Sequence, residues 1–417
     1  MYYNTFSQLD GKMVLPIIEF PAYIEELAKN FDCLFKQNRQ TQQFKRLLTG
    51  FGIADKHTIA HMNGLFISHT NQSNLNRFIT ESDWDPIEMN RIKIDMINDI
   101  ENGGVVVLDD YITEKYGKDI YGTDYHFDHT IGKSIWGQQI ADCVFSGKGI
   151  YPLLSTLYIK EDSRWLNDNF KTKIEIQKEH LTMLVNMNLK FSIVVMDSWY
   201  FCKTLIKHIE SLEKDWIARA KSNRLVKSKG KWISLDEFAR DKINKIKFRL
   251  VNVGDDKYIM KTFTVRIKDI GKVRLLISLD KHENFSFYVS NRLDWKELTI
   301  IRNYSRRWDI EVWHREGKGS YGLEECQLRC GDAVGRYLTL SALAATFLEI
   351  ASMLSPVYAA LIKRGRTPEM KHRWVIIELV SQLISLAAKV GDKIKKKIIE
   401  SILSPYKSTI NKRITDY

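Results

Sequence analysis

Residues 102–110 read Asn-Gly-Gly-Val-Val-Val-Leu-Asp-Asp, a turn signal followed by an apolar run and two acidic residues. The run Val105–Leu108 is short and rich in β-branched residues, which favours a central buried strand. This strand is predicted to end at Asp109-Asp110. A second run of the same kind, Phe191–Met196, ends at Asp197. Acidic residues therefore follow two buried strands, at the sheet edge where the sites of α/β proteins assemble.

The sequence around these strands predicts further elements of one α/β domain. Ile135–Phe145 and Ile150–Ile159 flank Ser-Gly-Lys-Gly and predict a hairpin beside the first strand. Lys171–Met187 predicts an amphipathic helix before the second strand, and Phe201–Leu212 and Trp216–Ala220 predict a helix and a strand after it. The fold class is therefore α/β, with a mixed sheet and flanking helices.

The sequence pattern changes between Leu225 and Arg292. Segments of alternating apolar and polar residues are separated there by Gly, Asp and Asn turns, so an antiparallel β insertion is predicted. Helical spacing returns over Leu298–Arg315, and the two ends of the chain are mostly helical, with a basic segment at Lys393–Lys397. The predicted organisation is a helical region 1–95, a first part of the α/β domain 96–224, a β-rich insertion 225–292, a last part of the α/β domain 293–335 and a helical region 336–417.

Composition favours a soluble protein that meets a polyanion. The chain has 63 Lys and Arg against 51 Asp and Glu, a formal net charge of +12. Nucleic acid is the first candidate partner and an anionic membrane the second. The apolar run Leu338–Leu348 is predicted to be a buried helix, because its uncharged part is shorter than the about 20 residues that span a bilayer. Five irregularly spaced cysteines and the absence of a signal peptide indicate reduced thiols in a cytoplasm.

A third segment strengthens the functional interpretation of the two aspartates at the strand ends. Either aspartate alone would more often be a surface residue that caps its strand. In Tyr304–Lys318, the residues Tyr304, Arg307, Glu311 and Lys318 stand three, four and seven residues apart. On a helix these offsets place the first three on one face and Lys318 two turns further along nearly the same stripe. A carboxylate beside cations and a phenol suits the binding of a hard metal ion and of phosphate.

These residues resemble the DDE-class transposases of bacterial and archaeal insertion sequences, in the group with a Tyr-x2-Arg-x3-Glu-x6-Lys signature. All four signature positions match, and Val107–Asp110 and Val195–Ser198 are similar to the strands that carry the family's first and second aspartates. The resemblance covers roughly residues 45–350. It implies an RNase H-like catalytic domain of the retroviral-integrase superfamily, interrupted by the β insertion.

The resemblance also implies the roles of the site residues. Asp109, Asp197 and Glu311 are expected to be catalytic and to bind two Mg2+ ions, for which Mn2+ could substitute. The expected DNA contacts are those of the rest of the signature: Tyr304, Arg307 and Lys318. The family often continues its first motif as Asp-Asp-Thr, whereas Tyr111 follows Asp110 here. Asp109 is therefore the first choice for the first ligand, and Asp110 the alternative.

The function implied is that of an endonuclease and strand transferase, which cuts DNA at transposon ends and joins them to target DNA. Its partners would be the terminal inverted repeats and the target, bound by a homodimer in a prokaryotic cytoplasm, where the protein is nucleoid-associated when on DNA. Region 1–95 would bind DNA. Three alternatives remain open: an RNase H-like nuclease without strand transfer, a domesticated DNA-binding protein, and an unrelated α/β protein with structural ion pairs.

Overall fold

The computed structural model describes residues 15–68, 70–128, 131–166, 169–253, 256–280, 282–354 and 368–389. The chain forms two compact units, Met1–Met89 with Glu316–Tyr417, and Asn90–Arg315. The basic segment Lys393–Lys397 of the sequence prediction lies outside the described residues.

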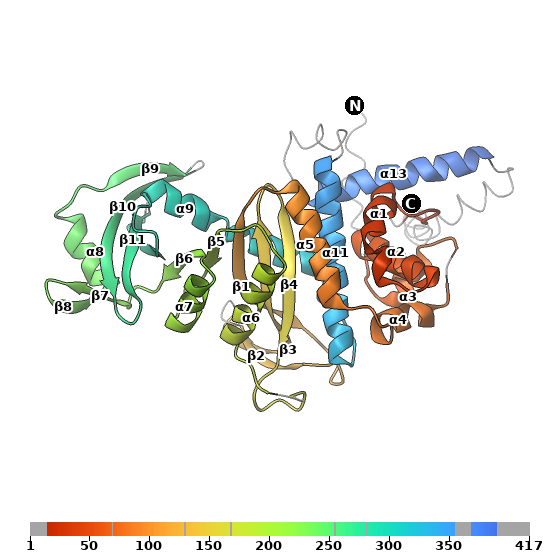
Figure 1. Cartoon of the computed structure of the whole chain (residues 1–417), viewed down its shortest axis with the longest axis horizontal. Coiled ribbons are helices and arrows are strands. Elements are labelled where there is room, and N and C mark those ends of the chain that lie inside the picture. The colour runs from red at the N-terminus through yellow and green to blue at the C-terminus, as the bar shows by residue number, and fades with distance from the viewer. Residues whose placement is uncertain are drawn as a thin grey trace, which may run out of the picture. The chain divides into compact units, whose positions relative to one another are not determined.

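The unit Asn90–Arg315 is built on a mixed sheet (Figure 1). Three antiparallel strands neighbour each other in the order β4, β3, β1, and β5 and β6 continue the sheet parallel to β1. The bounds are β1 Val105–Glu114, β3 Lys133–Ser146, β4 Ile150–Tyr158, β5 Ile193–Met196 and β6 Asp215–Ala220, with β2 Asp124–Asp128 paired to β3. Helices α6 (Lys173–Asn186) and α7 (Lys203–Ser211) precede and follow β5. This order and these directions are those of an RNase H-like sheet, and the predicted mixed α/β fold is confirmed.

The first strand is longer than the sequence predicts, because β1 does not end at Asp109-Asp110 but continues to Glu114. Its antiparallel partner β3 pairs with it along the whole length, whereas its parallel partner β5 pairs only with Val105–Leu108. The acidic pair therefore lies inside the strand, immediately beyond the end of the parallel pairing. The apolar run in the sequence corresponds to the part of β1 that is buried between two neighbouring strands. The strand itself continues beyond that run.

The β insertion joins the same sheet (Figure 1). Strand β12 pairs with β6, and the sheet reaches twelve strands in the described residues. The insertion consists of β7 Leu225–Ser228, β8 Lys231–Ser234, α8 Leu235–Ile243, β9 Arg249–Val253, β10 Asp256–Ile267, β11 Gly271–Leu279 and β12 Phe285–Ser290. The predicted antiparallel character is confirmed. Two short strands and α8 were not predicted, because β7 and β8 have four residues each, too few to show alternation.

The helical segment after the insertion is two helices, so the prediction of one continuous helix over Leu298–Arg315 is wrong. Helix α9 spans Glu297–Ser305 and α10 spans Trp308–Ser320. Between them the backbone N–H of Arg307 donates to the carbonyl of Tyr304 at 2.9 Å, a bond three residues back rather than four. The Arg306 guanidinium donates to the Ser146 and Gly147 carbonyls at 2.9 and 3.0 Å, which fixes this junction against the end of β3.

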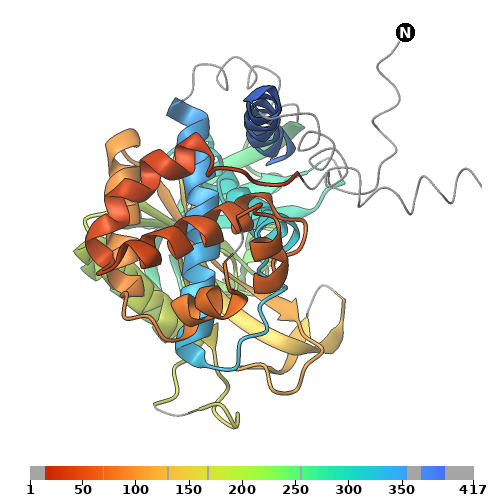
Figure 2. The same cartoon turned by 90° about the vertical axis from the view of Figure 1, so that its right-hand side faces the viewer.

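The other compact unit is helical. Figure 2 shows the red and orange N-terminal helices gathered beside the blue helix α11, Gly331–Leu354, which packs against α1, α2 and α4. The remaining bounds are α1 Ala22–Leu27, η1 Ala28–Leu34, α2 Asn38–Ile53, α3 Ile59–Gly64, α4 Gln72–Thr80, α13 Pro368–Lys389, and α5 Pro86–Ile100, which crosses the unit boundary. Helix α11 is long and apolar enough to cross a membrane, but 83% of its most apolar window is buried in the protein. It is a core helix, as the sequence predicts.

Candidate active site

The register of the two parallel strands brings the two aspartates together. Leu108 of β1 and Met196 of β5 are the last partners of that pairing, so Asp109 and Asp197 follow side by side. The pKa of the Asp109 carboxyl is raised to about 6, mainly by burial and in part by the nearby Asp197 charge, while the Arg307 guanidinium acts in the opposite direction. The site therefore holds a carboxylate whose charge the surrounding protein only partly compensates.

Arg307 connects the first aspartate to the glutamate of the third segment. One of its terminal nitrogens donates to Asp109 Oδ2 at 3.2 Å, and the other forms an ion pair with Glu311 Oε1. Because Arg307 stands at the junction of α9 and α10, its side chain reaches the sheet while Glu311 remains on the first turn of α10. Two carboxylates of the predicted triad thus share one guanidinium, and the third lies beside Asp109.

Tyr304 belongs to the same cluster. Its ring centre lies 4.6 Å from that of Tyr288 on β12. Burial raises the pKa of its phenol above the ordinary value, with Arg307 opposing this and Asp197 adding to it. Lys318 is further along α10, among the residues of the other compact unit, and its ammonium lies 3.7 Å from Glu324. Five of the six residues predicted for the site are therefore together in the unit Asn90–Arg315.

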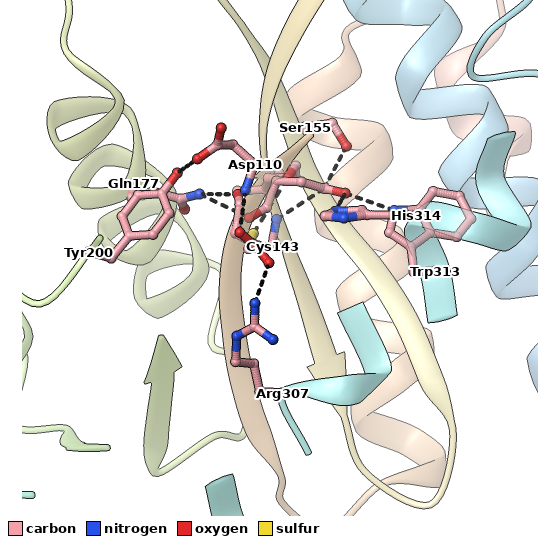
Figure 3. A network of polar contacts seen from close by, with 11 residues as sticks. Asp110, Cys143, Ser155, Gln177, Tyr200, Arg307, Trp313 and His314 are labelled. Carbon is pink, nitrogen blue, oxygen red and sulfur yellow. Dashed lines mark hydrogen bonds and ion pairs between the residues drawn. The ribbon is translucent and has the colours of Figure 1, made fainter. Parts of the chain in front are cut away.

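Asp110 points away from this cluster, as alternation along a strand requires. Its Oδ1 accepts a hydrogen bond from the Tyr200 hydroxyl at 2.8 Å, and its Oδ2 accepts from Gln139 at 2.6 Å and from the Lys173 ammonium at 2.9 Å. In Figure 3, Tyr200 and Gln177 lie on one side of the strand that carries Asp110, and Trp313 and His314 lie on the other side. Three donors occupy the Asp110 carboxylate, so its contacts are those of a structural anchor.

Asp142, which the sequence analysis missed, is a second carboxylate at this place. It lies opposite Asp109 in the β1–β3 pairing and is completely buried. Its oxygens accept hydrogen bonds from the Ser155 hydroxyl at 2.9 Å and the Trp313 indole at 2.8 Å, and the His314 ring nitrogen is 3.3 Å away. It therefore fastens α10, the Glu311 helix, to the sheet. The available signal was a single acidic residue inside the apolar run Ile140–Phe145 of β3.

The chemistry of the donors fits a hard divalent cation. Asp109, Asp197 and Glu311 offer only oxygen atoms, which Mg2+ and Mn2+ prefer. The raised pKa of Asp109 shows that its charge is poorly compensated, and a cation would compensate it. Within the described residues, no three His, Cys, Asp or Glu side chains are close enough as they stand to hold an ion. Arg307 occupies oxygens of two of the carboxylates, so a cation would compete with it for them.

The chain is similar to known transposases in several comparisons. Residues 175–347 match the family described as transposase DDE domain, and residues 30–233 match the family described as DDE superfamily endonuclease. A probable transposase for insertion sequence element IS701 of Microchaete diplosiphon is 25% identical over an alignment of 221 residues that covers 49% of this chain and 55% of that protein. The chain thus spans about half the length of that relative.

Two solved structures are also similar. One is a piggyBac transposase in a synaptic complex with hairpin DNA, with a TM-score of 0.46, 11% identity, and coverage of 94% of this chain and 82% of that one. The other is a Drosophila P element transposase in a strand transfer complex, with a TM-score of 0.23, 9% identity, and coverage of 91% of both chains. The two sequence matches together span residues 30–347, and by them the chain is similar to DDE-class transposases and endonucleases.

Proposed function

We propose that this chain is a DNA transposase that cuts DNA at the ends of its element and joins them to target DNA. The observation that carries the proposal is the convergence of Asp109 and Glu311 on Arg307, with Asp197 beside Asp109, in a chain that matches DDE families. Asp109 and not Asp110 is the first ligand, since the Asp110 carboxylate is already held by Tyr200, Gln139 and Lys173.

The three carboxylates would hold divalent ions, two Mg2+ in this proposal, with Mn2+ as a substitute. If bound there, such ions would lower the pKa of the attacking water or 3′-hydroxyl and would compensate the charge of the leaving oxygen. The chain's own residues position the DNA. Arg307, freed from the carboxylates, donates to the phosphate beside the scissile bond, and Tyr304 adds a hydrogen bond from its phenol.

The remaining proposals concern the rest of the chain. Lys318 completes the Tyr-x2-Arg-x3-Glu-x6-Lys signature and contacts the DNA backbone. The helical region 1–95 binds the terminal repeats and target DNA, and the net charge of +12 strengthens this binding. The catalytic domain comprises 96–224 and 293–335, with the insertion 225–292 between them and the helical region 336–417 after it. A homodimer holds two transposon ends, in the cytoplasm of a prokaryotic cell and on its nucleoid.

A strand-transfer assay tests the proposal against a nuclease. The protein is incubated with Mg2+, labelled duplexes that carry the ends of the element encoding the chain, and a supercoiled plasmid. A transposase yields labelled ends joined covalently to the plasmid. Cleaved ends without joined product would indicate a nuclease, and neither product with DNA binding intact would indicate a domesticated binding protein.

A further inference from the structure

A buried carboxylate outside the proposed active site holds the turn between β3 and β4. Glu101 follows the last residue of α5 and is 2% exposed. Its Oε1 accepts hydrogen bonds from the backbone N–H groups of Lys148 and Gly149 at 2.9 and 3.1 Å, and from the Tyr151 hydroxyl at 3.2 Å. A carboxylate buried this deeply is costly unless donors surround it, so these contacts define where the turn lies.

The turn also packs directly on this carboxylate, which requires glycine at position 147. A Cβ atom added to Gly147 would lie 2.6 Å from Glu101 Cδ and 2.7 Å from its Oε2, closer than side-chain atoms approach in folded proteins. The Gly147 N–H donates to the Gly149 carbonyl at 2.9 Å, which closes the turn. A displacement of the Glu101 carboxylate would therefore displace the turn.

Other groups of the same turn hold the start of α10. The Ser146 and Gly147 carbonyls accept hydrogen bonds from the Arg306 guanidinium at 2.9 and 3.0 Å, and the Ser146 hydroxyl donates to the Asp309 carboxylate. Arg306 and Asp309 stand five and two residues before Glu311. The turn thus connects Glu101 to the residues that flank the proposed metal ligand on its own helix.

Glu311 needs such a restraint from outside its helix. It lies in the first turn of α10, where no earlier turn of the same helix holds it. Groups that bind a metal ion have to be kept within about 0.5 Å of their working positions by the contacts of their neighbours. Arg306 and Asp309 supply those contacts, and both depend on a turn that Glu101 holds.

We propose that Glu101 is a positioning residue for the proposed metal site, because it fixes the β3–β4 turn against which the start of the Glu311 helix is placed. The inference rests on the proposed function, since Glu311 has to bind metal for its placement to matter. The donors to Oε1 are two amide groups and a hydroxyl, all of them neutral. The reach of that oxygen and not the negative charge therefore performs the task.

Mn2+ binding by the full chain without DNA tests the inference, measured from the electron paramagnetic resonance signal of the free ion. The binding that Glu311→Ala loses defines the site. Glu101→Ala should weaken this binding about tenfold, as expected for the loss of a contact that orients a ligand, whereas Glu101→Gln, which keeps the acceptor oxygen, should stay within about threefold of the wild type. With Mg2+, single-turnover DNA cleavage by Glu101→Ala should be at least about tenfold slower, with unchanged DNA affinity.

Asn98→Ala is the matched control. Asn98 lies three residues earlier on α5, and its amide is hydrogen-bonded to the Asn188 carbonyl and the Lys190 N–H, both at 3.0 Å. The change removes contacts between the same helix and a different turn, the one that precedes β5. Mn2+ binding and cleavage should match the wild type. Equal losses in Asn98→Ala and Glu101→Ala would overturn the inference, because they would reflect stability alone.

Glu101→Asp covers the case in which Glu101→Ala does not fold. It keeps the charge and shortens the side chain by one methylene group, so its carboxylate no longer reaches the turn and Mn2+ binding should weaken. Wild-type Mn2+ affinity in whichever of these two variants folds overturns the inference. Binding by Glu101→Gln as weak as that of Glu101→Asp overturns it too.

The outcome is separable from that of the proposed function. If the wild type cleaves and joins DNA while Glu101→Ala binds Mn2+ and cleaves as the wild type does, the inference fails and the proposed function stands. If Mn2+ binding depends on both Glu101 and Glu311 but the wild type does not cleave DNA, Glu101 positions a metal site and the proposed function fails.

Discussion

The Asp109 carboxylate lies in a buried environment that disfavours its negative charge. Burial raises its pKa from 3.8 to about 6, although Arg307 acts against this. Between these two values the folded protein retains a proton that the unfolded chain releases, so the free energy of unfolding falls as pH rises through this window. Without metal the loss is complete above pH 6 and amounts to about 3 kcal/mol. This cost to stability supports the proposed role of Asp109 in metal binding.

Asp109→Asn should therefore stabilise the protein in the presence of a chelator. We expect its thermal unfolding midpoint to exceed that of the wild type at pH 7 and to equal it near pH 4, measured by scanning calorimetry. Asp110→Asn is the control with the opposite sign, because it removes the charge that pairs with Lys173 at 2.9 Å and should cost about 1–3 kcal/mol. Equal destabilisation by both changes would show that Asp109 is structural as well.

Residue identity was predictable where a local motif carried it. Arg307 and Glu311 stand four residues apart and Asp109 follows an apolar run, so the sequence marked them as candidates, and the resemblance to DDE-class transposases implied their roles. Asp142 was not predictable as a contact of the Glu311 helix, because its indole partner is 171 residues away in sequence. The different roles of Asp109 and Asp110 also depend on distant side chains, which decide the environment on each face of β1.

Helix α10 is positioned by buried polar contacts in addition to its buried apolar residues Ile310 and Trp313. Trp313 and His314 meet the fully buried Asp142, and at its start Asp309 accepts a hydrogen bond from Ser146. Such contacts fix the rotation of the helix about its axis more closely than apolar packing does, because each has one geometry. The orientation of Glu311 follows from that rotation.

Asp142→Asn should uncouple α10 from the sheet. An amide cannot accept all the donors that now surround the carboxylate, so we expect a loss of about 2–4 kcal/mol in stability and at least a tenfold slower DNA cleavage. Trp313→Phe, which keeps the ring and removes one hydrogen bond, should have a smaller effect of the same sign. Cleavage at the wild-type rate in a folded Asp142→Asn protein would contradict the anchoring role.

Helix α6 contributes a pH dependence of its own. Burial lowers the pKa of His180 from 6.5 to about 4, and its Nε2 lies 2.7 Å from the Thr156 hydroxyl of β4. The folded state keeps the ring neutral while the unfolded chain protonates it, so this stability is present above pH 6.5 and is lost as pH falls to about 4. The total is about 3 kcal/mol. Unfolding of His180→Gln, followed by circular dichroism, should show a flatter acid limb; an unchanged limb would argue against a buried neutral ring.

Elements with strong periodicity were predictable together with most of their boundaries, whereas the break between two consecutive helices was not. The hairpin β3–β4 and the strands β5 and β6 were predicted to within about two residues at each end. The break between α9 and α10 was missed because the contacts of Arg306 with Ser146 and Gly147 are made across 160 and 159 residues of sequence. Helical spacing continues through that junction and conceals it.

At the scale of the molecule, charge and sheet continuity define what the protein can bind. The insertion continues the catalytic sheet through the β12–β6 pairing, which the sequence could not show because pairing depends on which edge is open. From composition, the +12 charge predicts a polyanionic partner, and the salt dependence of DNA binding tests that prediction.

DNA affinity should depend steeply on salt. If six or more phosphates are contacted, the association constant falls about a thousandfold or more between 50 and 200 mM salt, because each contact releases counterions. Titrations of the wild type and Glu311→Ala should give parallel lines of log K against log salt. A slope near zero would indicate that the net charge does not serve DNA binding.

The most direct test of the carboxylate triad is single-turnover cleavage of DNA carrying the element's ends, with Mg2+ or Mn2+, by the wild type and by Asp109→Ala, Asp110→Ala, Asp197→Ala and Glu311→Ala. DNA binding and thermal unfolding are measured on the same preparations. We expect Asp109, Asp197 and Glu311 variants to bind with wild-type affinity and to cleave at least about a thousandfold more slowly, whereas Asp110→Ala loses stability and retains metal-dependent cleavage. Wild-type cleavage by the triple alanine variant would contradict the account.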